Sequence, residues 1–337
     1  MDLPAGWRQR RPTLDDVDEL LAVARASDEA ALGFPDFSAD DVREALTGPN
    51  SDPARDSWVA LDPDGAIVAW AYLENPTGAA REFVEVYVRP GRGEPAQRRL
   101  LALALERSAE RAAAFGHPRM TVRGGAIPTE TAWVAALREA GFEFFKRYAR
   151  MRRPLAGVSP EAPTPPDGVT IRPVRPGDEA EMREFHRILD TAFRDTLEYD
   201  PQSYELWRHR LAAQSSIAWD EWFVAEVDGR PAGVLQSSDQ SLEHNEGWVK
   251  NLAVLREHRK RGLGAALLAR AFSAYAAKGR AYAGLGVDLS NPTEAARLYT
   301  SVGMAAEYEA DMYERDVSSR PAYGDAVRVG RERSSAT

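Results

Sequence analysis

A chain of 337 residues is long for one compact domain and sufficient for two cores of about 150 residues each. It has no cysteine, which excludes disulfides, thiolate metal sites and a cysteine nucleophile. Its 43 basic and 52 acidic residues give a formal net charge of −9, which argues against nucleic acid as a partner. No apolar run reaches the about 18 residues of a membrane span, and residues 1–11 do not resemble a signal peptide. We therefore expect a cytoplasmic protein without a membrane partner.

The two halves of the chain share short motifs at an offset of about 164 residues. Arg11-Pro12 recurs as Arg175-Pro176, and Pro128-Thr129-Glu130 recurs as Pro292-Thr293-Glu294. Repetition at one offset indicates a tandem duplication, and the proline-rich stretch between the copies is typical of a stiff linker. We predict an N-terminal domain over residues 1–153, a linker over 154–168, a C-terminal domain over 169–317 and a disordered tail over 318–337.

Each copy follows the order strand, helices, two strands, a long central strand, helix, strand, helix, strand. This alternation predicts an α/β fold with a mixed sheet and helices on both faces. In the second copy, we expect strands over residues 169–174, 222–226, 232–237, 246–254, 282–288 and 305–315, and helices over 179–193, 201–212, 262–278 and 292–302.

A basic loop containing two glycines lies between the strand of residues 246–254 and the helix that follows. It reads Arg259-Lys260-Arg261-Gly262-Leu263-Gly264-Ala265. Because Gly262 and Gly264 have no Cβ, the backbone can turn sharply and approach a bulky anion. The free N–H groups and the macrodipole of the helix start, with the three basic side chains, favour negative charge there. The loop therefore predicts a diphosphate site, although it matches neither the Rossmann nor the Walker pattern.

A second motif follows this loop. The segment begins at Asn291-Pro292, where a capping side chain precedes a proline, and runs through Tyr299 to Gly303-Met304. Together with Arg259-x-x-Gly262-x-Gly264, it resembles the GNAT acetyltransferase superfamily. Met304 departs from the aromatic residue that is usual at the last position.

The resemblance implies an α/β fold of two tandem GNAT domains, each a mixed, mostly antiparallel sheet with a central splayed parallel pair of strands. It implies an acyltransferase with acetyl-coenzyme A as co-substrate, whose pantetheine arm lies between the splayed strands. The histidines show no metal-ligand spacing, so no metal is expected. The implied cofactor-binding residues are Leu252, Ala253, Val254, Arg259, Lys260, Arg261, Gly262, Leu263, Gly264, Ala265 and Asn291.

Acetyl transfer to an amine requires a neutral nucleophile, a polarised carbonyl and a proton for the departing thiolate. The resemblance makes Tyr299 the candidate acid, although it could be only an aromatic that packs a helix on the sheet. Many relatives carry a glutamate four residues before the position of Leu252, where this chain has Trp248. Glu246 shares the face of Trp248 and is a candidate base, directly or through water, or simply a strand-end glutamate. Glu243 and His244 are further candidates for the base.

The first copy differs at both motifs. It reads Arg92-Gly93-Glu94-Pro95-Ala96 where the loop should be, and Leu137 takes the place of Tyr299. Pro95 has no N–H, and Glu94 puts negative charge where a diphosphate would lie. We expect a degenerate, catalytically silent domain, and whether it binds coenzyme A stays open.

The C-terminal half partly resembles tandem enzymes of the mycothiol synthase kind, and Trp248 puts the same acceptor in doubt. Asp195, Glu198 and Asp200 could bind an ammonium group or form an ordinary charged connection. The favoured function is N-acetylation of a small-molecule amine, such as an amino sugar, an amino acid derivative or a natural-product amine. Peptide acetylation and non-catalytic acyl-coenzyme A sensing are the alternatives, and we expect a monomer or a homodimer.

Overall fold

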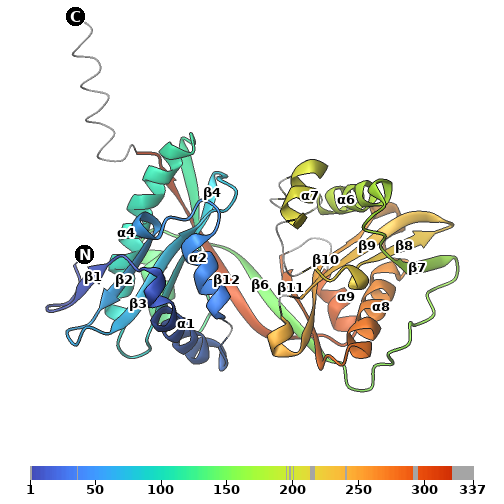
Figure 1. Ribbon diagram of the computed structural model, residues 1–337, viewed down its shortest axis with the longest axis horizontal. Coiled ribbons are helices and arrows are strands. Elements are labelled where there is room, and N and C mark those ends of the chain that lie inside the picture. Colours follow the sequence, from blue (N-terminus) through green and yellow to red (C-terminus); the bar gives the residue numbers. More distant parts are fainter. Residues whose placement is uncertain are drawn as a thin grey trace, which may run out of the picture. The chain divides into compact units, whose positions relative to one another are not determined.

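The computed structural model describes residues 2–320, except residues 36, 195, 197, 198, 200, 213–216, 240 and 291–294. The chain forms two compact units. Unit 1 consists of Met1–Lys146 and Ala310–Thr337, and unit 2 consists of Arg147–Glu309. In each unit, a mixed sheet carries helices on both faces (Figure 1).

Unit 1 holds the elements of the first copy except its last strand, together with the second half of the last strand of the second copy. In chain order these are β1 (Arg8–Arg10), η1 (Leu14–Asp16), α1 (Val17–Leu32), α2 (Ala39–Thr47), α3 (Pro53–Asp56), β2 (Ser57–Leu61), β3 (Ile67–Glu74), β4 (Arg81–Val88), α4 (Glu94–Ala114), β5 (Arg119–Ala126), α5 (Thr131–Glu139) and β12 (Ala305–Ser318). The strand order is β1-β2-β3-β4-β5-β12, antiparallel except for the parallel pair β4–β5. One core lies against α1 and α2, and another lies against α4 and α5 on the other face.

Unit 2 repeats this plan with the last strand of the first copy added. Its elements are β6 (Glu143–Pro154), β7 (Val169–Pro173), α6 (Glu179–Phe193), α7 (Tyr204–Ala212), η2 (Trp219–Glu221), β8 (Phe223–Val227), β9 (Arg230–Ser238), η3 (Leu242–His244), β10 (Glu246–Val254), η4 (Arg256–His258), α8 (Leu263–Ala277), β11 (Tyr282–Asp288) and α9 (Ala295–Ser301). The strand order is β6-β11-β10-β9-β8-β7, and only β10–β11 is parallel. Helices α6 and α7 cover one face, and α8 and α9 cover the other (Figure 1). The predicted fold is confirmed.

The sequence of α6 explains both where the helix begins and which face it buries. The side chain of Asp178 accepts hydrogen bonds from the backbone N–H groups of Ala180 and Glu181. Met182 and Phe185 recur at helical spacing and are buried in the core beneath the helix. These contacts hold α6 on the face of the sheet opposite α8.

The last strand of each copy pairs with a strand of the other copy. Residues 311–318 of β12 pair with β5 in unit 1, and residues 148–154 of β6 pair with β11 in unit 2. The compact units therefore divide after Lys146 and after Glu309, whereas the sequence suggests boundaries near residues 153 and 169. Because the copies are duplicates, either final strand fits the equivalent sheet edge, and sequence alone does not distinguish the two pairings.

The proline-rich segment between the copies is part of unit 2 and packs against its sheet. Leu155 is buried, and its N–H donates a hydrogen bond to the carbonyl of Ala281. The predicted tail begins at residue 318, but β12 continues through Ser318, and residues from 321 onward lie outside the described part. None of the described helices is long and apolar enough to cross a membrane.

Candidate functional site

The central strands of unit 2 part from each other along their length. Their parallel register joins Glu246 to Tyr282 and ends at Trp248 and Gly284, although β10 continues to Val254 and β11 to Asp288. Each strand stays paired on its outer side, β10 with β9 and β11 with β6. The register of β10 with β9 also shifts between Val249 and Asn251, a bulge that bends the strand. The inner backbone edges therefore open a gap that includes Leu252 and Ala253, where a ligand amide can bond.

The basic loop leads from β10 into the start of α8. Lys260 and Gly262 have left-handed φ angles of 60° and 80°. Gly262 caps α8, and its carbonyl accepts the N–H of Ala266 at 2.9 Å. The N–H groups of Leu263, Gly264 and Ala265 have no acceptor within the helix, as at every helix start. These donors and the helix dipole make the turn a suitable site for an anion.

The basic and glycine residues of this loop divide into different roles. Arg259 braces the loop, because its Nε donates to the carbonyl of Val254 at 3.0 Å and its Nη2 donates to the carbonyl of Ala192 at 3.2 Å. Lys260 and Arg261 are exposed and are available to a diphosphate. Gly264 serves packing, since a Cβ there would lie 2.8 Å from Leu298 Cδ2 on α9. Leu263 is buried in the core, so only its backbone can bind a ligand.

Tyr299 lies on α9, next to the leucine that contacts Gly264. It is 9% exposed and packs in the core beneath α8 and α9. Burial raises the pKa of Tyr299 to about 12, so the phenol is protonated throughout the neutral range. Asn291, the remaining predicted cofactor ligand, lies outside the described residues, as do Asp195, Glu198 and Asp200.

Glu246 is enclosed in an ionic cluster at the paired end of β10. It is 0% exposed; its Oε2 accepts a hydrogen bond from Arg150 Nη2 at 2.5 Å, and its Oε1 lies 3.2 Å from Arg152 Nε. Burial raises the pKa of Glu246, and the charges of Arg150 and Arg152 oppose that rise. Along the strand, Glu246 is six residues from Leu252, which is roughly 20 Å. This position favours a structural role, and the assignment of Glu246 as a base stays a prediction.

Sequence reasoning missed the residues that hold this cluster. Arg150 and Arg152 lie on β6, which the predicted boundaries place in the other domain, and both contact Glu307 on β12. It also passed over Lys250, at the bulge of β10, where burial and the charge of Arg210 lower the pKa of the lysine. The alternation of arginines in β6 was the available signal, but its partners depend on strand pairing.

The equivalent loop in unit 1 is filled by its own side chain. The carboxylate of Glu94 accepts a hydrogen bond from the N–H of Gly91 at 2.6 Å, and Pro95 follows without an N–H. Arg92 pairs with Asp62. A carboxylate therefore occupies the turn where a diphosphate would need donors. This supports the prediction that the first copy is degenerate.

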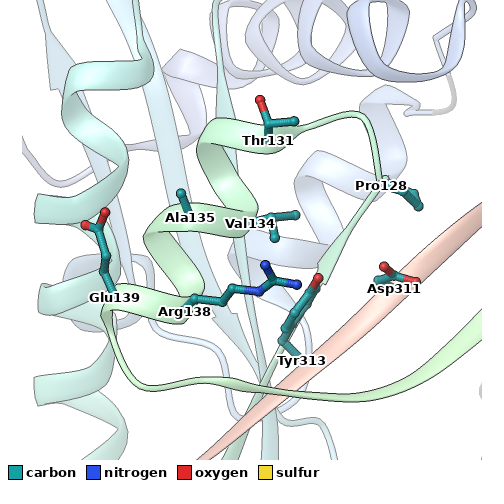
Figure 2. A pocket seen from close by; sticks show the side chains of 8 residues that line it. All are labelled: Pro128, Thr131, Val134, Ala135, Arg138, Glu139, Asp311 and Tyr313. Atoms are coloured by element: carbon teal, nitrogen blue, oxygen red, sulfur yellow. The ribbon is translucent and has the colours of Figure 1, made fainter.

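Unit 1 also contains a cavity of about 500 Å³ between α5 and β12 (Figure 2). The guanidinium of Arg138 lies 5.8 Å from the centre of the Tyr313 ring, and Glu139 points away from it and pairs with Arg98 at 2.7 Å. No predicted site residue lines this cavity. Its lining residues are Pro128, Thr131, Val134, Ala135, Arg138, Glu139, Asp311 and Tyr313. Among the described residues, no group of three His, Asp or Glu side chains is placed to hold a metal ion.

The chain is similar to known acetyltransferases, and the similarity to the two relatives below extends over most of its length. Residues 218–303, which include the splay, the loop and Tyr299, match the family model of the acetyltransferase (GNAT) domain. The mycothiol acetyltransferase of Thermobispora bispora is 30% identical over 314 residues, covering 90% of this chain and 98% of that protein. That of Streptomyces griseus subsp. griseus is 28% identical over 323 residues, covering 94% and 98%.

Two solved structures are similar in fold. The GCN5-related N-acetyltransferase from Sphaerobacter thermophilus has a TM-score of 0.81 at 24% identity and covers 95% of this chain and 99% of its own. A tandem GNAT protein from the clavulanic acid biosynthesis pathway has a TM-score of 0.65 at 18% identity, with coverage of 94% and 99%. These similarities concern the fold of both copies.

Proposed function

The chain belongs to the GNAT superfamily of acetyltransferases, and we propose that unit 2 transfers the acetyl group of acetyl-coenzyme A to the amine of a small molecule. The observation that carries this proposal is the combination, in one unit, of the splayed strands β10 and β11 with the capped start of α8. The acceptor class is an amino sugar, an amino acid derivative or a natural-product amine. Relatives named as mycothiol acetyltransferases support a small-molecule acceptor.

The proposed donor site uses two kinds of backbone donor. The diphosphate accepts hydrogen bonds from the first N–H groups of α8, with Lys260 and Arg261 supplying charge. The pantetheine amides pair with the open inner edge of β10 at Leu252, Ala253 and Val254. A backbone N–H of the same edge then polarises the thioester carbonyl, where negative charge develops as the amine attacks.

The chemical step needs two proton movements. As the acceptor nitrogen bonds to the carbonyl carbon, the C–S bond breaks and the nitrogen loses a proton. Tyr299 is the proposed donor to the departing sulfur, since its phenol stays protonated at neutral pH, and the phenolate that results regains a proton from water before the next turnover. Between Glu246 and Val254, β10 carries no carboxylate. We therefore propose that the acceptor amine enters in its neutral form and releases its proton to water after bonding.

Replacing Tyr299 by phenylalanine tests the proposed acid. The aromatic ring still fills the core, but no hydroxyl remains to protonate the thiolate. We expect kcat to fall between about tenfold and a hundredfold, with a KM for acetyl-coenzyme A within about twofold of wild type. Steady-state kinetics with varied acetyl-coenzyme A gives both values. An unchanged kcat would remove Tyr299 from the chemistry and would leave it a packing residue.

The pH dependence tests the proposal that the acceptor amine enters in its neutral form. For an amine of pKa near 9, kcat/KM should rise about tenfold per pH unit between pH 6 and 8, because the neutral fraction of the amine rises in the same way. At alkaline pH, kcat/KM should not decrease until the pH exceeds about 10. Burial raises the pKa of Tyr299 to about 12, so the protonated phenol persists up to that range. The pH at which kcat/KM stops rising should follow the pKa of each amine tested. A break fixed near pH 6 for every amine would instead indicate an enzyme carboxylate as the base.

A further inference from the structure

Gly286 is a glycine for which the fold of unit 2 gives no reason. It lies near the middle of β11, it is exposed, and its φ is not in the left-handed region. A Cβ built on Gly286 meets no atom of the described residues within 4 Å. Glycine weakens the interior of a strand and often marks a place where a ligand approaches the backbone closely.

Gly284, two residues earlier on the same face of β11, does have a packing reason. A Cβ there would collide with the carboxylate of Glu246 and would lie 3.1 Å from Cε3 of Trp248. The carboxylate of Glu246 and the ring of Trp248 therefore fill the space over Gly284. The two glycines form a matched pair: protein atoms cover Gly284, whereas no described side chain covers Gly286.

The open position lies beside the start of the splay. The last parallel pair joins Trp248 to Gly284, so Gly286 is the next residue of its face beyond that pair. Leu285 and Val287 are buried in the core beneath α8 and α9, so Gly286 faces the other side of the sheet. An acceptor that reaches the thioester between the strands from this side would pass over Gly286.

The neighbouring side chains give this position a flat wall without net charge. Arg150 lies opposite Gly286 in the register of β6 with β11, and its Cζ lies 4.9 Å from the centre of the Trp248 ring. The guanidinium donates to Glu246 at 2.5 Å and to Glu307 at 3.0 Å, so its charge is balanced. Such a wall suits a neutral ring that packs against it more than an isolated ion.

Building on the proposed transferase function, we propose that Gly286 opens a subsite for an uncharged ring that the acceptor carries beside its amine. The ring, of about the size of a pyranose, packs along the wall formed by Trp248 and Arg150. Gly286 is thereby a specificity-determining residue, because any larger side chain occupies the place of the ring. Small amines without a ring do not need this space.

The variant Gly286→Val tests the subsite, because valine suits an exposed strand position and leaves the core unchanged. We expect kcat/KM for glucosamine and cyclohexylamine to fall at least about 30-fold, while kcat/KM for ethylamine and the KM for acetyl-coenzyme A stay within about twofold. Thermal unfolding should match wild type. Gly284→Val is the matched control and should lower the unfolding temperature, since it displaces Glu246. An equal fall in kcat/KM for all three amines, or an unchanged kcat/KM for both ring-bearing amines, would overturn the proposal.

A direct binding measurement separates this proposal from the transferase itself. If wild-type protein acetylates none of the amines, the proposed function fails, and the subsite is then judged by calorimetric titration of glucosamine into the protein saturated with coenzyme A. Weaker binding to Gly286→Val than to wild type supports the subsite. Equal or undetectable binding overturns it. If Gly286→Val lowers kcat/KM for both cyclohexylamine and glucosamine, the subsite recognises the shape of the ring. If it lowers kcat/KM for glucosamine alone, the subsite recognises the hydroxyl groups.

Discussion

Replacing Gly262 by valine is expected to raise the Kd for acetyl-coenzyme A about 1000-fold and to abolish turnover at ordinary donor concentrations. Gly262 caps α8 with a φ of 80°, a conformation that a β-branched residue rarely adopts. The loop must therefore move, and the N–H groups of Leu263, Gly264 and Ala265 lose their common direction. Two misplaced bonds to a charged phosphate, each worth about 1.5–3 kcal/mol, account for a loss of this size.

The first copy supplies a matched control for this substitution. Gly91 also has a left-handed φ, of 75°, and a Cβ there lies more than 4 Å from every atom that the structure describes. Gly91→Val therefore imposes comparable backbone strain on a loop that Glu94 already occupies. Calorimetric titration should give one donor site in wild type and in Gly91→Val, and none in Gly262→Val. Loss of the site in Gly91→Val would mean that unit 1 binds the donor.

Replacing Glu246 by alanine is expected to lower the free energy of unfolding by about 3–5 kcal/mol, because it removes one of the two carboxylates that Arg150 and Arg152 share and leaves net positive charge in a buried setting. Guanidinium denaturation measures the change directly. The loss arises from desolvated positive charge, so Glu246→Gln should be destabilised in the same direction. Glu243, which is exposed nearby in η3, is the control, and Glu243→Ala should leave stability unchanged.

The variants Glu246→Ala and Glu246→Gln also decide whether Glu246 is a structural residue or a general base. If Glu246 is structural, Glu246→Gln lowers the stability of the protein, and the molecules that stay folded at low temperature keep the wild-type kcat. A general base would lose about a hundredfold or more in kcat in Glu246→Gln, at wild-type stability. That second result would contradict the reading of the cluster and would restore Glu246 as the base.

The elements that local sequence controls were predictable. Gly262 lies where a helix must begin after a tight turn, and the pattern Arg259-x-x-Gly262-x-Gly264 located that turn correctly. The alternation of strands and helices likewise predicted the mixed sheet, because period and punctuation are properties of neighbouring residues. The splay of β10 and β11 followed from the resemblance and not from periodicity.

What sequence could not provide depends on long-range pairing. Arg150 meets Glu246 only because β6 pairs with β11, and a duplicated chain offers two equivalent edges for that strand. Gly264 is indistinguishable from a ligand-contacting glycine until Leu298 is found against it. Gly286 carries no signal of its own, since its meaning depends on the space above it and on the contrast with Gly284.

Release of free thiol from acetyl-coenzyme A, followed with a chromogenic disulfide reagent, tests the central claim most directly. The chain has no cysteine, so the protein contributes no thiol background. Wild-type protein should release coenzyme A only in the presence of a small amine, with ring-bearing amines ahead of ethylamine, and the acetylated amine should appear in equal amount. Release that requires a basic peptide and not a small amine would indicate peptide acetylation. Donor binding without release for any acceptor would contradict a transferase and would indicate a sensor of acyl-coenzyme A.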